Sequence, residues 1–233
     1  MHTLIIVAHP EYDDSSTQAF LNRAQAALQR DNITWHRLSD DQPLNVALEQ
    51  RLLLQAERII FQFPLYWYSA PALLKRWEDE VLTRAFTFAN EQGKLAGKQL
   101  GIVTSLGYPE AEFQVGGAEG FSLSEILVPF RALAHRAGMQ FLKPLIINQF
   151  AYQTPGEQQQ LLIEYQQYLT APQPLHLQER VQWLITQLHH LQTQQPDDQH
   201  QTIELIIAQL QANQDHLDDL KDQIQLIRQA EEE

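Results

Sequence analysis

The sequence contains no cysteine. This absence excludes a disulfide scaffold, a thiolate metal site and a cysteine nucleophile. Basic residues are also scarce, because 16 Lys and Arg stand against 29 Asp and Glu in 233 residues, a formal net charge of -13. Proteins that bind a phosphate backbone need clustered Lys and Arg, so nucleic acid is not an expected partner.

Long apolar runs are absent as well. The longest apolar stretches, residues 3–8 and 58–68, are much shorter than the roughly 20 residues that cross a bilayer. No basic segment with a cleavage site marks the start as a secretory leader. A metal site is not expected either, because there is no HExxH motif and the adjacent His189 and His190 diverge on a helix. We therefore expect a cytoplasmic protein without direct membrane insertion.

The chain has two regions of different composition. In residues 1–172, strand-like apolar runs alternate with helical runs, whereas residues 173–233 contain no glycine and are rich in Gln and Leu. The predicted strands are residues 4–8, 33–38, 58–63, 99–105 and 141–148, and the predicted helices are residues 16–29, 46–55, 71–86, 122–138 and 155–169. Apolar strands that alternate with helices indicate an α/β fold with a parallel sheet. Five such strands predict a doubly wound sheet of strand order 2-1-3-4-5, as in flavodoxin.

The second region has the periodicity of a coiled coil. One helical run spans residues 177–191, and a break at residues 194–198 predicts a turn with an Asp cap before the next helix. In that helix the apolar seam consists of Ile203, Ile206, Leu210, Leu217, Leu220, Ile224 and Ile227, with Asn213 as its one polar member. Four heptads predict an α-helical tail, in the form of a hairpin, that self-associates or docks on a partner protein.

Three loops follow the predicted strands at the edge where doubly wound sheets bind ligands. In the first, His9, Ser15 and Thr17 surround a helix start, where hydroxyl and N–H groups form an anion site or simply an N-cap. The second, residues 63–71, sets large aromatic side chains between two prolines. Such rings stack on a flat aromatic ligand, or fill a core or a subunit interface. In the third, Thr104, Ser105 and Gly107 allow close backbone approach to a ligand, or form an ordinary turn.

Together these motifs resemble the flavodoxin-like NAD(P)H:quinone oxidoreductases, a family that includes DT-diaphorase and ancillary subunits of glutathione-gated potassium efflux systems. The resemblance covers residues 1–170. It rests on His9-Pro10 with Ser15, on Phe63-Pro-Leu-Tyr-Trp-Tyr-Ser-Ala-Pro-Ala-Leu-Leu-Lys75, and on Thr104-Ser-Leu-Gly107. It implies a flavin-binding domain over residues 1–172, with FMN or FAD as cofactor, NAD(P)H as electron donor, and a homodimer or higher oligomer.

The resemblance also implies a role for each loop. The residues expected at the flavin phosphate are His9, Ser15, Thr17 and Gln18. Those expected along the isoalloxazine are Pro64, Leu65, Trp67 and Tyr68, and those at its polar edge are Thr104, Ser105, Leu106 and Gly107. The catalytic candidates are Tyr108 and Phe113, which would flank the face where nicotinamide and quinone alternate. Two positions depart from the family: Gln18 replaces a usual Asn, and Leu106 replaces a usual Gly and is expected to narrow the space over the ring.

The implied activity is two-electron, ping-pong hydride transfer from NAD(P)H to a small-molecule quinone. Two alternatives stay open. A flavoprotein ancillary subunit of a membrane transport system would make use of the helical tail, and an azo- or nitroreductase would use the same cofactor with another acceptor. The residues favour FMN over FAD, because no segment clearly offers an adenine pocket. They do not distinguish NADH from NADPH.

Overall fold

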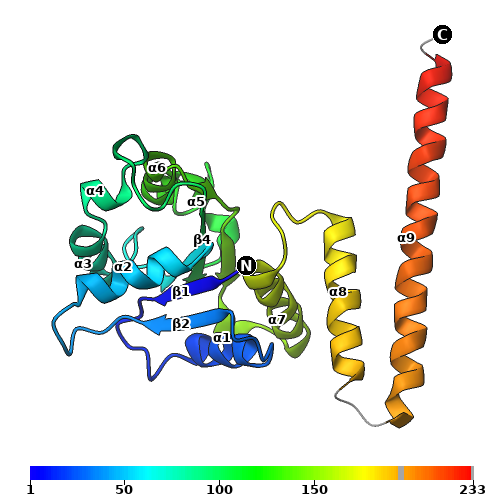
Figure 1. Cartoon of the computed structure of the whole chain (residues 1–233), viewed down its shortest axis with the longest axis horizontal. Helices are drawn as coiled ribbons and strands as arrows, with labels where there is room; N and C mark the ends of the chain where they lie inside the picture. The colour runs from blue at the N-terminus through cyan, green and yellow to red at the C-terminus, as the bar shows by residue number, and fades with distance from the viewer. Residues whose placement is uncertain (194–196, 232–233) are drawn as a thin grey trace. The chain divides into compact units, whose positions relative to one another are not determined.

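The computed structural model describes residues 1–193 and 197–231 (Figure 1). The chain forms two compact units, Met1–Thr170 and Ala171–Glu233. The first unit is built on a parallel sheet of strand order β2-β1-β3-β4-β5, in which β6 also pairs with β4. Its strands are β1 (Thr3–Val7), β2 (Ile33–Arg37), β3 (Arg58–Pro64), β4 (Gln99–Leu106), β5 (Gln140–Phe141) and β6 (Leu145–Asn148). The predicted doubly wound sheet is confirmed.

The fifth strand differs from its prediction as one continuous element. It consists of β5 and β6, which pair with opposite ends of β4 and are separated by residues 142–144. Pro144 lies in this gap and has no N–H to donate to β4, which explains why the ladder is interrupted there.

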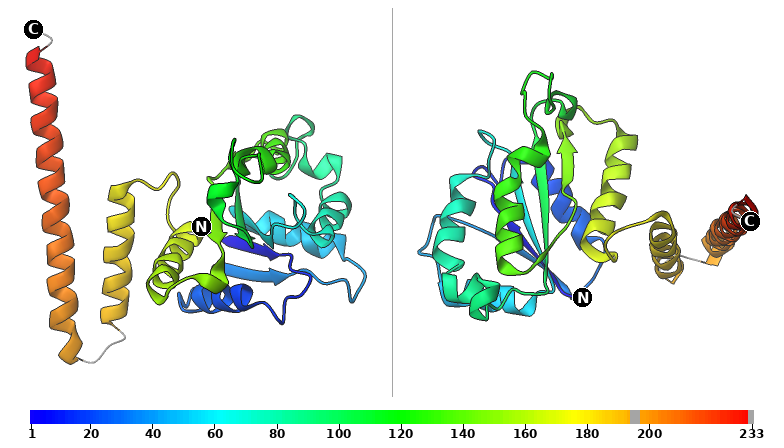
Figure 2. Two further views of the ribbon diagram at one scale, coloured as in Figure 1. Left: turned by 180° about the vertical axis from the view of Figure 1, so that it is seen from behind. Right: turned by 90° about the horizontal axis from the view of Figure 1, so that it is seen from above.

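Helices cover both faces of the sheet (Figure 2). On one face, α1 (Ser16–Ala26) and α7 (Pro155–Thr170) bury apolar side chains against the strands. On the other, the corresponding helices are α2 (Val46–Gln55), α3 (Ala72–Val81) and α6 (Val128–Ala137). The connections contain the short elements α4 (Arg84–Thr87), η1 (Ala89–Glu91), η2 (Glu110–Glu112), α5 (Leu123–Ile126) and η3 (Phe150–Tyr152).

Three helices are shorter than predicted, and the first of them, α1, ends at Ala26 instead of at residue 29. The helix expected over residues 71–86 ends at Val81, and Pro71 precedes it as the N-cap residue instead of opening its first turn. The helix expected over residues 122–138 is interrupted at Leu127, between α5 and α6. The predicted capping box of Ser122 and Glu125 is present, and Gly138 ends α6 with a left-handed backbone (φ +69°).

The second unit contains α8 (Leu177–Gln192) and α9 (Asp197–Glu231). They pack through the buried side chains of Ile185, Ile203 and Ile207. Residues 194–196 of the predicted turn lie outside the described residues, so the structure does not describe the expected Asp cap. Among the described helices, none combines the length and apolar character needed to cross a membrane.

Candidate functional site

The carboxyl ends of the parallel strands meet at one edge of the sheet, and the loops that follow them hold the exposed aromatic rings of the first unit. These are Tyr66, Trp67 and Tyr68 after β3, Tyr108 and Phe121 after β4, and Tyr152 after β6. The chain order reverses between β1 and β3, and doubly wound sheets bind ligands at such a point. The aromatic loops therefore lie where a ligand site is expected.

The loop after β1 presents hydrogen-bond donors. The Ser15 side chain caps α1 by accepting the N–H of Gln18 at 3.2 Å. Within the described residues, the N–H groups of Ser16 and Thr17 have no acceptor. The Nδ1 atom of His9 accepts the N–H of Glu11 at 3.1 Å, and burial lowers the pKa of this imidazole. The ring is therefore neutral with its proton on Nε2, so the loop can offer three N–H groups to an anion.

The loop after β3 contains a strained turn. The backbones of Tyr66 and Ser69 hydrogen-bond to each other in both directions, at 2.9 and 3.0 Å. Between them Trp67 (φ +49°) and Tyr68 (φ +62°) both adopt the left-handed conformation, which costs about 1–2 kcal/mol for each non-glycine residue. The Trp67 side chain is 93% exposed. Strain that displays a large ring to solvent does not serve packing, and it points to a binding role.

Contacts with β4 and with the loop after it hold this turn in place. The N–H of Leu65 donates to the carbonyl oxygen of Ser105 at 2.9 Å, which fixes the start of the turn on β4. The carboxylate of Glu119, in the loop after β4, interacts with the phenol of Tyr68 and raises the pKa of Tyr68. The second and third predicted loops are therefore joined at the site.

The loop after β4 is organised around Glu112. Its Oε2 atom accepts the N–H of Ala118 at 2.8 Å, and its carbonyl oxygen accepts the N–H of Glu119 at 3.2 Å. Gly117 is required by this packing, because a Cβ atom there would lie 2.3 Å from the carbonyl oxygen of Glu112. The loop thus has a defined internal structure that holds Glu119 near the strained turn.

Beneath the loops lies a buried chain of polar groups. Gln62 Nε2 donates to Gln18 Oε1 at 2.6 Å, and the Tyr165 hydroxyl donates to Gln62 Oε1 at 2.7 Å. Burial raises the pKa of Tyr165 well above its ordinary value, so its hydroxyl remains a donor. The structure therefore places Gln18, predicted at the phosphate, inside the domain, where it connects α1 to β3. Gln62 and Tyr165 are not among the predicted site residues, although Gln62 is the one uncharged polar residue of β3.

The residues predicted along β4 differ in their access to ligand. Thr104 is fully buried, and among the described residues its hydroxyl has no hydrogen-bond partner. Leu106 is also buried, as is Pro64 opposite Ser105 on β3. Gly107 is exposed, and an added Cβ would meet no atom within 4 Å. The open surface therefore begins at Gly107.

The two catalytic candidates lie in the loop that continues from Gly107. Tyr108 is exposed, and Phe113 is half-buried after η2. The structure brings this loop to the same edge as the loops after β1 and β3, as the parallel pairing of β1, β3 and β4 requires.

A fourth segment, after β6, was missed by the sequence analysis. Asn148 Oδ1 accepts the N–H of Glu110 at 3.0 Å and so joins β6 to the loop after β4. Gln149 has a left-handed backbone (φ +42°), and the Tyr152 side chain is 81% exposed. These residues lie at and after the end of the fifth predicted strand, where the rule that ligands bind at the carboxyl ends of strands also places a ligand contact.

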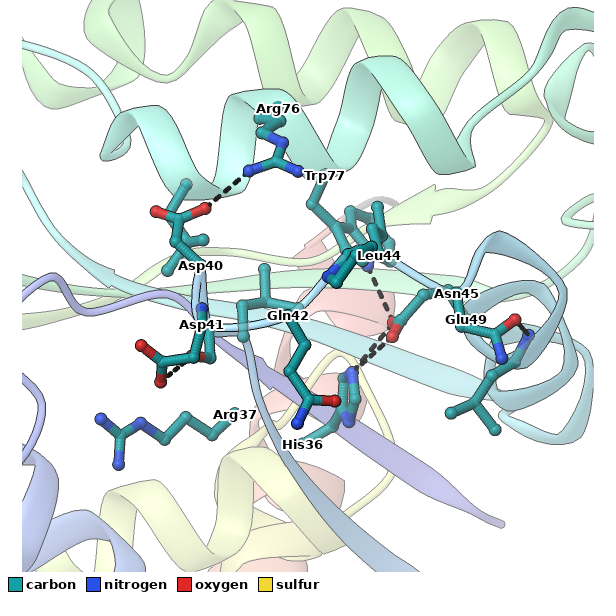
Figure 3. A pocket seen from close by; sticks show the side chains of 15 residues that line it. His36, Arg37, Asp40, Asp41, Gln42, Leu44, Asn45, Glu49, Arg76 and Trp77 are labelled. Carbon is teal, nitrogen blue, oxygen red and sulfur yellow. Dashed lines mark hydrogen bonds and ion pairs between the residues drawn. The ribbon is translucent and has the colours of Figure 1, made fainter.

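A cavity of about 390 Å³ lies beside this edge, after β2 and between α2 and α3 (Figure 3). Its wall includes Glu49, which accepts hydrogen bonds from Trp77 Nε1 at 2.8 Å and from His36 Nε2 at 2.9 Å. Burial raises the pKa of Glu49, but these hydrogen bonds outweigh it and the net pKa lies below its ordinary value. None of the predicted site residues lines this cavity.

Comparison with known proteins gives the first unit a family. Residues 1–169 match the model of a family described as "Flavodoxin-like fold". "Uncharacterized NAD(P)H oxidoreductase YrkL" of Bacillus subtilis (strain 168) is 44% identical over 146 residues, 61% of this chain and 82% of that protein. "Glutathione-regulated potassium-efflux system ancillary protein KefG" of Cronobacter sakazakii is 38% identical over 172 residues, 72% of this chain and 92% of that protein.

Two solved structures are similar as well. A crystal structure titled as an NADPH-quinone reductase from P. pentosaceus is 51% identical, with a TM-score of 0.69 and coverage of 73% of this chain and 98% of that one. General stress protein 14 of Treponema denticola, in complex with FMN, is 31% identical, with a TM-score of 0.65 and coverage of 72% and 98%. The sheet order, the ligand edge and these matches agree, and the chain belongs to the family of proteins with a flavodoxin-like fold.

Proposed function

We propose that the chain is a flavin-dependent NAD(P)H oxidoreductase that reduces quinones by two-electron, ping-pong hydride transfer. The observation that carries this proposal is the strained turn at Trp67 and Tyr68, which holds a large ring in solvent at the edge where the chain order reverses. The NAD(P)H oxidoreductase and NADPH-quinone reductase names of the relatives support it.

The first loop fits the phosphate of a flavin. The free N–H groups of Ser16 and Thr17, the Nε2–H of His9 and the start of the α1 dipole all favour a negative group. Ser15 shapes this loop by capping α1, and Gln18 holds the helix from below through Gln62. We favour FMN, because the similar structure from Treponema denticola contains it.

The second and third loops fit the flavin ring. Once bound, the flavin supplies the redox chemistry, since it can accept a hydride from NAD(P)H and pass two electrons to a quinone. Leu65, Trp67 and Tyr68 line one side of the ring in this proposal, and Ser105 and Gly107 contact its polar edge. Pro64, Thr104 and Leu106 are buried and support these loops from below. The turn backbone offers hydrogen bonds there, because the N–H groups of Trp67 and Tyr68 have no acceptor within the described residues.

The remaining aromatic side chains position the two substrates. Tyr108 and Phe113 flank the open face in this proposal, so that nicotinamide and quinone stack there in turn and bulk water is excluded. One shared face explains a ping-pong order, because the first product must leave before the quinone enters. A cytoplasmic setting matches the NAD(P)H donor.

A second candidate is an ancillary subunit that uses the same flavin chemistry to regulate a transport system. The KefG relatives favour it, and so does the helical second unit, which lies outside the residues that the family model matches. In either case we expect a homodimer or higher oligomer, with the C-terminal helices available to a partner protein. An azo- or nitroreductase differs only in its acceptor.

Steady-state kinetics with a panel of acceptors tests the proposal. With NADPH or NADH as donor and menadione as acceptor, we expect double-reciprocal plots that form parallel lines, and lower rates with an azo dye and a nitroaromatic. Trp67→Ala should reduce flavin binding and activity together, whereas Ser122→Ala, at a cap in the connection before α6, should reduce neither. Intersecting lines would contradict the ping-pong order, and a preference for the azo dye would change the acceptor class.

A further inference from the structure

The far part of α9 carries an apolar stripe that has no partner in the described structure. Leu217, Leu220, Ile224 and Ile227 form this distal stripe, and their side chains are between 39% and 59% exposed. The cluster that joins α8 and α9 uses earlier residues, of which the last is Leu210. Because α8 has 16 residues and α9 has 35, the hairpin leaves this end of α9 uncovered.

Charges are sorted around the distal stripe. At about 100° per residue, Lys221 and Arg228 lie within roughly 80° of its middle. The four aspartates of the same segment, Asp215, Asp218, Asp219 and Asp222, lie about 120–180° away, on the back of the helix. The Lys221 Nζ atom is 2.7 Å from Asp218 Oδ1, but both side chains are well exposed, so this pair contributes little stability and leaves the lysine available.

This sorting disfavours a second copy of the chain as the occupant. In a two-helix coiled coil the residues that flank one seam face the flanking residues of the other helix. In an antiparallel pair of α9 helices, Lys221 and Arg228 would face the same two side chains of the other copy. In a parallel pair, Lys221 would face His216 and Arg228 would face Gln223, so neither pairing brings an acidic side chain to these cations. A helix with acidic flanks would instead make favourable ion pairs with Lys221 and Arg228.

We propose that the distal stripe docks an amphipathic helix of a different protein, whose apolar seam is flanked by Glu and Asp. Asn213, four residues before Leu217, occupies the preceding position of the same seam and would favour one register of that partner at some cost in affinity. The proposal does not depend on the flavin chemistry, because the family match ends at residue 169.

Two synthetic peptides of equal length test the proposal with the full-length protein. Both carry Leu at the seam positions, and one carries Glu and the other Lys at all flanking positions. Fluorescence anisotropy should show the Glu peptide binding at least tenfold more tightly than the Lys peptide, and this preference should shrink in high salt.

Variants of the chain sharpen the test. The double variant Lys221→Glu/Arg228→Glu should reverse the preference, whereas Asp222→Asn, on the back of the helix, should leave it unchanged. Leu220→Asp should weaken binding of the Glu peptide at least tenfold, and circular dichroism should show that α9 remains helical.

Other results would overturn the proposal. Equal binding of the two peptides, or no binding of either, would contradict the proposal that the partner helix has acidic flanks. A smaller oligomer for Leu220→Asp in sedimentation velocity, together with no peptide binding, would show that the stripe joins copies of the chain.

Discussion

The two units use apolar side chains in different ways. In the first, the sheet buries apolar clusters on both faces, and the exposed aromatic rings are confined to loops at one edge. In the second, α8 and α9 share a small cluster around Ile185, Ile203 and Ile207 and leave a regular stripe exposed. Aromatic side chains exposed on irregular, strained loops are typical of small-molecule sites, whereas apolar side chains exposed at heptad spacing are typical of a surface that docks another helix.

The largest expected difference in stability is between substitutions of a buried and of an exposed tryptophan of the first unit. Trp77 is 1% exposed and Trp67 is 93% exposed. Trp77→Ala should lower the free energy of unfolding by about 3–5 kcal/mol, because it opens a cavity and removes the hydrogen bond that Glu49 accepts from the indole. Trp67→Ala should change it by less than about 0.5 kcal/mol, since no packing is lost. Urea unfolding checks both, and equal losses would refute the assignment of Trp67 to binding.

A similar pair tests the second unit. Ile203 is buried between α8 and α9, whereas Ile227 lies in the distal stripe. Ile203→Ala should lower the stability of the hairpin by about 2 kcal/mol, at the low end for a core isoleucine because the cluster is small. Ile227→Ala should change it by less than about 0.5 kcal/mol. Thermal unfolding followed by circular dichroism makes the comparison, and a large effect at Ile227 would mean that the stripe already has a partner.

A third comparison separates capping from binding at two serines. Ser15 and Ser122 both cap helices by accepting a backbone N–H. Each Ser→Ala change should cost about 1 kcal/mol of stability. Only Ser15→Ala should also weaken FMN binding, because only this cap lies in the proposed phosphate loop. Flavin fluorescence titration gives the dissociation constants, and equal affinities for the two variants would argue against a phosphate at α1.

The smallest effect concerns the titration of His9. Burial lowers the pKa of its ring below 6.5, and Glu11 partly opposes this shift. The folded state favours the neutral ring. The contribution of His9 to the stability of the flavin-free protein is therefore complete above pH 6.5, and it is lost as the pH falls toward the lowered pKa. Glu11→Gln should lower the pKa further, and NMR titration of the ring measures it. A His9 pKa above 6.5 without ligand would contradict this account.

Much of the fold could be predicted because it depends on local sequence patterns. Apolar runs of strand length located the strands, and their alternation with helices predicted the doubly wound strand order. Ser122 with Glu125 marked a helix start. The split between β5 and β6 was missed although Pro144, which cannot donate to a ladder, was visible in the run. The heptad seam of α9 was also predictable, because periodicity does not depend on the rest of the chain.

The candidate site was harder to predict because it depends on contacts between distant residues. Gln62 bonds to residues 44 and 103 positions away, and no local pattern links these three side chains. The left-handed backbone of Trp67 and Tyr68 was equally hidden, because these residue types do not favour it. The roles assigned to individual residues around a flavin therefore stay predictions.

The most direct test of flavin-dependent oxidoreduction is an anaerobic visible spectrum of the full-length protein loaded with FMN. We expect the absorbance of the bound flavin to bleach when NADPH or NADH is added and to recover when menadione follows. A protein that takes up neither FMN nor FAD, or a bound flavin whose spectrum stays unchanged with both donors, would contradict the account.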